Sequence, residues 1–171
     1  REFNTYTGTY KGVEITVTST GIGAPSAAIA MEEMYESGMQ VAVRMGTVMS
    51  MQDDMLGHFM IPIAAMRREG TSQTYVDLSY PAVADIELVN VMNETVQQMG
   101  KRYLNGLNCT MDGFYSCMHD SKFSLECGRD MSKTFEEVKK LGVTGIDMES
   151  SCILTLGRLM GVKTCILTVV T

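Results

Sequence analysis

The sequence lacks several features that define particular classes of protein. It has no tryptophan, three prolines and two histidines, and His58 and His119 have no partner spacing for a metal site or a Ser-His-Asp triad. No stretch concentrates Lys and Arg, and the net charge is −6, which argues against nucleic acid as the main partner. No apolar run reaches the length of a membrane span, and no signal peptide opens the chain.

The five cysteines form no recognisable framework. Their number is odd and none are spaced as Cys-x-x-Cys, so neither a disulfide scaffold nor a zinc site follows. Reduced thiols fit a cytoplasmic protein best. Apolar residues make up 45% and charged residues 20%, which is ordinary globular composition. We therefore expect a cytoplasmic globular protein with no membrane partner and no nucleic-acid partner.

Both ends of the sequence fall within segments that we expect to be structured. Arg1 stands in place of an initiator Met, and the chain stops within the strand-like run 166–171. We expect residues 1–171 to form a single domain that is truncated at both ends.

Strand-like and helix-like segments alternate along the chain. Apolar or β-branched runs predict strands, and good helix formers bounded by Pro, Asp or Gly predict helices. The predicted strands are 13–18, 41–45, 59–65, 103–111, 144–147 and 163–170, and the predicted helices are 27–35, 85–99, 132–141 and 150–160. This alternation favours an α/β fold with a mixed central sheet flanked by helices.

Gly21 and Gly23 lie between the first predicted strand and a helix. Backbone N–H groups at such a helix start suit an anion or a closely approaching ligand, although a tight turn with no ligand explains the same residues. Ser26 stands where the dinucleotide fingerprint needs its third glycine, which makes a dinucleotide-binding oxidoreductase a weak alternative.

Arg44 and Thr47 follow an apolar strand, with Gly46 between them. A buried Arg must be paired, and its planar fork matches phosphate oxygens. Thr47 can add a hydroxyl, and Gly46 allows a ligand to approach the backbone. The segment therefore predicts either a phosphate site or an Arg paired with a structural carboxylate.

Asp147 and Glu149 flank Met148 at a strand-to-helix junction. In an extended segment the two carboxylates point to the same side, and the carboxyl end of a strand is a suitable place to bind ligand hydroxyls. Both could instead be helix-capping acids that a helix dipole stabilises. Phe114 and Tyr115 follow Gly113 and could stack on a base or pack in the core.

Taken in order, these pieces resemble the uridine phosphorylases, within the nucleoside phosphorylase superfamily. A single motif of this length is weak, but six in the right order are specific. The matching segments are 1–3 (REF), 19–30 (STGIGAPSAAIA), 44–47 (RMGT), 80–85 (YPAVAD), 112–115 (DGFY) and 147–150 (DMES).

The resemblance implies an enzyme of nucleoside salvage, a pentosyltransferase that uses phosphate to cleave a pyrimidine nucleoside to base and ribose 1-phosphate. It implies a homohexamer built of dimers and no required cofactor. Arg44 and Glu149 would carry the catalysis. The implied phosphate ligands are Arg44, Thr47 and a neighbouring subunit's Arg1; the implied nucleoside ligands are Thr47, Phe114, Asp147, Met148 and Glu149; and the implied ligands of a monovalent cation, K⁺ in particular, are Glu2, Ile22 and Ser26.

The sequence also departs from the family pattern. Met118 and Asp120 fall near the places where the family usually has the Gln and Arg that read uracil, and we expect them at the nucleoside site. Asp147 replaces a Glu, and Val48 and Met49 are expected to crowd a ligand-facing loop. The family's N-terminal phosphate loop is not within the 171 residues, so we expect these residues alone to be inactive. A purine nucleoside phosphorylase, a nucleosidase and a non-catalytic nucleoside-binding relative remain open.

Overall fold

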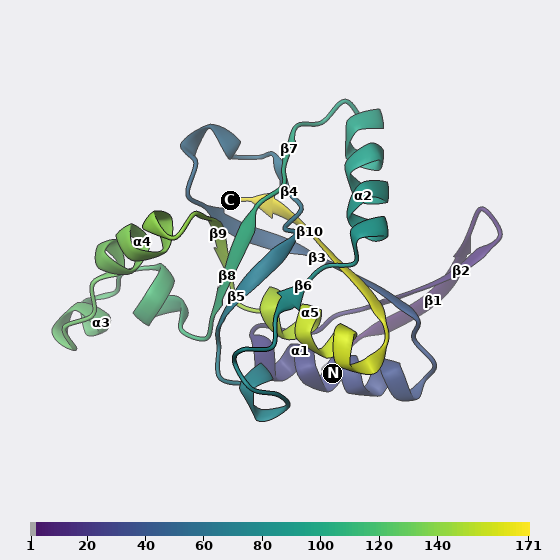
Figure 1. The fold of residues 1–171 in the computed structure, drawn as a ribbon, viewed down its shortest axis with the longest axis horizontal. Coiled ribbons are helices and arrows are strands. Elements are labelled where there is room, and N and C mark those ends of the chain that lie inside the picture. The colour runs from purple at the N-terminus through teal and green to yellow at the C-terminus, as the bar shows by residue number, and fades with distance from the viewer. Residues whose placement is uncertain (1–2) are drawn as a thin grey trace.

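The computed structural model describes residues 3–171 and is built around one mixed sheet of eight strands (Figure 1). The strand order is β6-β5-β8-β9-β3-β10-β4-β7. Parallel pairs (β5–β8, β8–β9, β3–β10, β4–β7) combine with antiparallel pairs (β5–β6, β3–β9, β4–β10). The expected mixed α/β sheet is confirmed. The strands are β3 (Val41–Ser50), β4 (Phe59–Met60), β5 (Ala64–Arg68), β6 (Ala82–Val83), β7 (Tyr103–Leu104), β8 (Leu107–Met111), β9 (Val143–Asp147) and β10 (Lys163–Val170).

Helices cover the sheet, and α5 is the most deeply buried of them. Figure 1 shows α1 and α5 packed together, with α2 beside β10 and α4 next to β9 on the opposite side of the molecule. Small side chains such as Ala24 and Ala28 allow α1 to approach α5 and its Leu154. The helices are α1 (Ala24–Glu36), α2 (Ile86–Gln98), α3 (Lys122–Glu126), α4 (Met131–Lys140) and α5 (Ser150–Met160). No helix within residues 3–171 is long and apolar enough to cross a membrane.

Two strands differ from their predicted extent because the backbone bends. The run 59–65 divides into β4 and β5 around Pro62, which has no N–H to donate to a ladder. The run 103–111 divides into β7 and β8 at the matching place, and Ile61 and Ile63 still donate to the carbonyls of Leu104 and Gly106. Because of the bend, both segments cross from one half of the sheet, at β4 and β7, to the other half, at β5 and β8.

β3 is longer than predicted and continues through Val48 and Met49 to Ser50. Val48 is buried against Met55 and Met60. The expected ligand-facing loop after Thr47 is therefore corrected: these residues form a strand, and the side chain of Val48 packs in the core.

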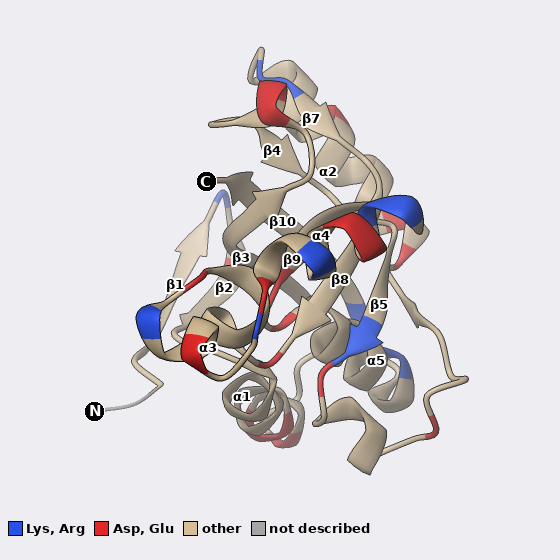
Figure 2. Ribbon diagram, turned by 90° about the vertical axis from the view of Figure 1, so that its left-hand side faces the viewer, with Lys and Arg blue, Asp and Glu red and all other residues tan. Residues whose placement is uncertain are grey.

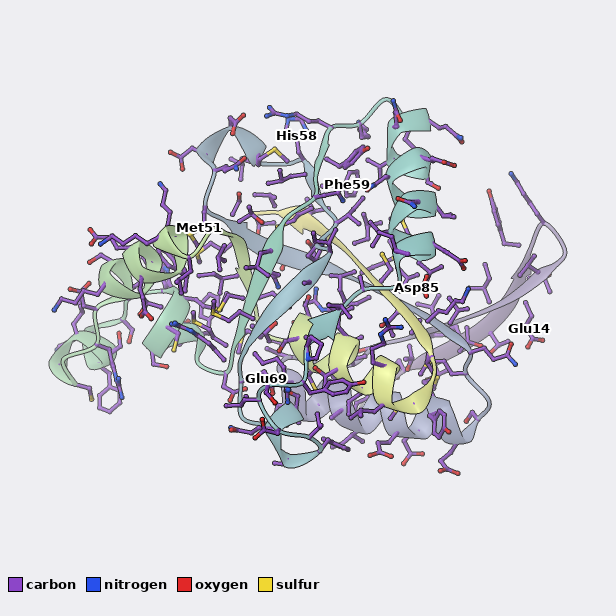
Figure 3. The ribbon with its side chains drawn as sticks, viewed as in Figure 1. Glu14, Met51, His58, Phe59, Glu69 and Asp85 are labelled. Atoms are coloured by element: carbon purple, nitrogen blue, oxygen red, sulfur yellow. The ribbon has the colours of Figure 1, made fainter. Side chains whose placement is uncertain are left out.

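The strands β1 (Thr5–Tyr10) and β2 (Val13–Thr18) form a separate antiparallel hairpin that projects from the body of the molecule (Figure 1). Glu14 lies near its far end (Figure 3). Strand alternation places threonines on one face and apolar side chains on the other. The exposed apolar residues are Tyr6, Tyr10, Val13, Ile15 and Val17.

Candidate functional site

Arg44 on β3 contacts two acidic side chains, Asp147 at the end of β9 and Glu149 just before α5. Its Nη1 lies 3.4 Å from Asp147 Oδ2, and its Nη2 donates to Glu149 Oε2. The side chains are 13%, 2% and 8% exposed, respectively. The prediction that the two carboxylates point to the same side is confirmed. Two carboxylates face one guanidinium, so this cluster carries a formal charge of −1 when all three groups are ionised.

One nitrogen of the Arg44 guanidinium makes no hydrogen bond within residues 3–171. Nη1 is buried, and none of the residues from 3 to 171 accepts a hydrogen bond from it. The guanidinium lies over Gly46, where a Cβ atom would come within 2.9 Å of Nη1 and 3.0 Å of Cζ. The glycine therefore makes room for the Arg44 side chain itself. Thr47 lies next along β3 with its side chain exposed.

The glycine loop before α1 binds Glu149. The backbone N–H of Gly23 donates to Glu149 Oε1 at 2.6 Å, and Gly23 has φ 92°, a conformation that glycine adopts without strain. The anion expected at this helix start is thus supplied by the protein's own carboxylate. Glu149 occupies the N-cap position of α5 but makes no capping bond there. Its carboxylate instead accepts at the start of α1, where Gly23 is the N-cap residue.

Asp147 is enclosed by donors from its own sheet and helix. Oδ1 accepts from Asn108 Nδ2 at 2.8 Å and from Thr110 Oγ1 at 2.9 Å. The backbone N–H of Ser150 donates to Oδ2 at 3.2 Å, which caps the start of α5 as the alternative reading held. Sequence reasoning missed Asn108 and Thr110. Their spacing of two residues on a strand is a signal for one shared face.

An exposed aromatic cluster follows β8. The rings of Phe114 and Tyr115 lie 5.1 Å apart and edge to face, and the His119 ring lies 5.8 Å from Phe114. Phe114 begins a π-helix, Phe114–Met118, a form that often occurs at functional sites. Because β8 and β9 are parallel neighbours, this cluster follows the same sheet edge as Asp147. Sequence reasoning missed His119 as a member of this cluster.

The other predicted site residues lie in varied places. Met118 is 5% exposed in the core beside Cys109 and Val138, so its side chain is not presented to a ligand. Asp120 is exposed and accepts from the N–H of Met131 at the start of α4. Met148 is half-buried against the same core.

Two of the three predicted cation ligands, Ile22 and Ser26, lie at the N-terminal side of α1. Ile22 is 80% exposed, and Ser26 Oγ donates to the carbonyl of Thr20. Arg1 and Glu2 lie outside the described residues. Within the described part of the chain, no group of three or more His, Cys, Asp or Glu could hold a metal ion. Figure 2 shows basic and acidic segments interspersed, with no continuous basic stripe on the visible face.

Comparison with known proteins identifies the family. The family model described as "Phosphorylase superfamily" matches residues 1–171. Uridine phosphorylase of Thermococcus kodakarensis is 37% identical over 164 residues, covering 95% of this chain and 59% of that protein. Uridine phosphorylase of Escherichia coli K12 is 32% identical, covering 95% and 65%. Guanosine phosphorylase of Halorubrum lacusprofundi is 29% identical, covering 95% and 63%.

The solved structures agree with the sequence matches. Uridine phosphorylase from Vibrio fischeri ES114, complexed with 6-hydroxy-1-naphthoic acid, superposes with a TM-score of 0.88 at 32% identity, covering 100% of this chain and 66% of that one. The chain belongs to the phosphorylase superfamily and has the nucleoside phosphorylase fold. It spans about three fifths to two thirds of the length of these relatives.

Proposed function

We propose that the protein is a uridine phosphorylase that cleaves a pyrimidine nucleoside with phosphate, releasing free base and ribose 1-phosphate in nucleoside salvage in the cytoplasm. The observation that carries this proposal is the buried Arg44 guanidinium, which has an unbonded Nη1 and lies between Asp147 and Glu149. A buried N–H donor that has no hydrogen-bond acceptor in the protein can donate to an anionic oxygen.

The proposed reaction needs an anion held below the sugar and support for charge that spreads over it. A phosphate oxygen forms a bond to C1′ while the bond from C1′ to the base nitrogen breaks. The electron pair of the broken bond leaves with the base. Arg44 and Thr47 hold the phosphate. Glu149 accepts from the ribose hydroxyls beside Met148 and favours the positive charge that develops on the sugar. Glu149 must then exchange its contact with Arg44 for contacts with the substrate.

The base side of the site is the part in which this chain departs from its family. Phe114 can stack on a base, and Tyr115 and His119 extend the aromatic surface. Met118 lies in the core, so its side chain is not presented to a base, whereas Asp120 is exposed and accepts from the N–H of Met131. The similarity to a guanosine phosphorylase makes a purine nucleoside the second candidate substrate.

The proposed assembly is a homohexamer built of dimers. An exposed apolar hairpin face supports it, because strands with one unburied apolar face normally pack on a partner. Arg1 would reach the phosphate of a neighbouring subunit. No cofactor is required for the reaction. A monovalent cation such as K⁺ would lie at the interface near Glu2, Ile22 and Ser26, where the Ser26 hydroxyl keeps lone pairs free while it donates to Thr20.

The test uses the full-length protein that contains this chain. We expect uracil and ribose 1-phosphate from uridine only when phosphate is present, and we would compare inosine and guanosine in parallel. Arg44→Gln should lower phosphate-dependent turnover by about 10²- to 10³-fold, the cost typical of one lost transition-state donor. Arg102→Gln is the matched control, since Arg102 pairs with Asp54 at the surface.

Other outcomes would identify the alternatives. Base release that does not need phosphate would indicate a nucleosidase. Phosphorolysis of inosine or guanosine but not uridine would indicate a purine enzyme. Nucleoside binding without turnover of any of the three would indicate a non-catalytic relative and contradict the proposal.

A further inference from the structure

Asp147 and Glu149 both contact Arg44, but only Asp147 is fixed by several other groups. Asn108, Thr110 and Ser150 all donate to Asp147, and the three side chains are at most 1% exposed. A carboxylate enclosed in this way leaves no free side for a nucleoside hydroxyl. Among residues 3–171, the charged group paired with it is Arg44.

Glu149 is held by fewer groups. Its carboxylate accepts from the backbone N–H of Gly23 and from Arg44. When ligands bind, the ion pair between Arg44 and Glu149 can be exchanged for two new contacts. Arg44 then donates to phosphate oxygens, and Glu149 accepts from the sugar hydroxyls. Asp147 cannot exchange in the same way, because it would leave the buried donors of Asn108 and Thr110 unpaired, which is costly.

We propose that Asp147, fixed by Asn108 and Thr110, is a positioning residue that holds the Arg44 guanidinium in place for phosphate while Glu149 turns to the sugar. This inference rests on the proposed phosphorolysis. The 3.4 Å separation of Arg44 Nη1 from Asp147 Oδ2 is an ion-pair distance without a hydrogen bond. Nη1 is therefore oriented by charge and remains free to donate to the ligand.

The first test is Asp147→Asn in the full-length protein, with KM measured separately for phosphate and for nucleoside. Removing groups that orient ligating residues in metal sites costs about 10- to 100-fold, and we expect the phosphate KM to rise on that order. The nucleoside KM should change by no more than about twofold, because Asp147 does not touch the sugar. Asp147→Glu, which keeps the charge and is the residue usual in the family it resembles, should restore most of the phosphate affinity.

The second variant is Asn108→Leu, which removes one hydrogen bond from Asp147 and little else. The Asn108 Oδ1 atom has no partner among residues 3–171, and Leu has a similar shape. A purely structural role predicts an unchanged phosphate KM. A positioning role predicts an increase of about threefold, as expected for one hydrogen bond. Because this variant leaves no donor of its own unpaired, it decides the question even where Asp147→Asn fails to fold.

Asp85→Ala is the stability control. Asp85 caps α2 through the N–H of Leu88 and lies between α2 and β10 (Figure 3), so its loss should lower the melting temperature and leave the phosphate KM unchanged. Phosphate-independent turnover by the parent protein would remove the proposed function itself. A phosphate-dependent parent whose phosphate KM is unaffected by Asn108→Leu and by any folded Asp147→Asn would overturn the positioning role. Equal increases in both KM values would also overturn it.

Discussion

At the scale of single residues, the main feature of the site is that its charged groups are buried. One guanidinium and two carboxylates lie together with little exposure, and a buried charge is tolerated only when it is paired and hydrogen-bonded. Asp147 meets that condition through Asn108, Thr110 and Ser150, and Glu149 meets it through Gly23 at the positive end of α1. A phosphate brought to Arg44 adds further negative charge. The proposed second cation, a neighbouring subunit's Arg1, would offset that charge.

The substitution Gly46→Ala tests the position of Arg44 without removing any charge. In Gly46→Ala the added Cβ would lie 2.9 Å from Arg44 Nη1 and 3.0 Å from Nη2, so the guanidinium must move. A misplacement of about 1 Å can cost about 100-fold in rate. We expect kcat/KM for phosphate to fall by about 10- to 100-fold, while circular dichroism shows an unchanged fold.

Arg102→Gln is again the control, since Arg102 pairs with Asp54 at the surface and takes no part in the site. We expect its kinetics to equal those of the parent. Parent-like phosphate kinetics in Gly46→Ala would show that Arg44 does not need its present position.

At the scale of elements, local signals predicted helices better than strands. The Asp85 cap and the following glycine set the limits of α2 within a residue or two, because capping is decided by neighbours in the sequence. β3 was predicted to end at Met45, since Arg44 and Gly46 interrupt its apolar run. It continues because eight of its residues pair with β10, from Lys163↔Val41 to Val170↔Val48. That partner lies over a hundred residues away, and a local pattern cannot report it.

An ion pair between two elements gives a prediction about acid stability. Arg68 at the end of β5 pairs with Glu137 on α4, and the hydrogen bond and charge of Arg68 lower the pKa of Glu137 below its usual 4.5. A carboxylate whose folded pKa is lowered stabilises the fold above its unfolded pKa, and this contribution is lost as pH falls through the lowered value. The melting temperature of Glu137→Gln should therefore lie below that of the parent at pH 7.

The difference between the two melting temperatures should shrink as pH falls below 4.5 and vanish once Glu137 is protonated. It should also shrink in high salt, because Glu137 is 59% exposed. A difference that stays constant from pH 7 down to acid would assign the effect to packing rather than to charge.

At the scale of the whole molecule, topology assembles what the sequence separates. Arg44, Thr110 and Glu149 come from three distant segments and meet because β3 and β8 both border β9. Gly23 joins them because α1 packs on α5. Each motif suggested its own chemistry from sequence. Two contacts could not be predicted without the strand order: Glu149 with the glycine loop, and Asp147 with Asn108 and Thr110. The alternation of strands and helices along the chain leaves that order open.

The reactivity of the five cysteines reports how tightly the molecule is packed. Burial raises the pKa of Cys109 and of Cys152 to about 12 and that of Cys165 to about 11, and all three are fully buried. The thiolate is the reactive form, so a disulfide reagent at pH 8 should not label these three in the native protein. Exposed Cys127 should react first and half-buried Cys117 more slowly, with the remaining three reacting only after unfolding in denaturant. Mass spectrometry of peptides after timed labelling would identify each site. Rapid native labelling of Cys109 or Cys152 would mean that the sheet and α5 open far more readily than their dense packing implies.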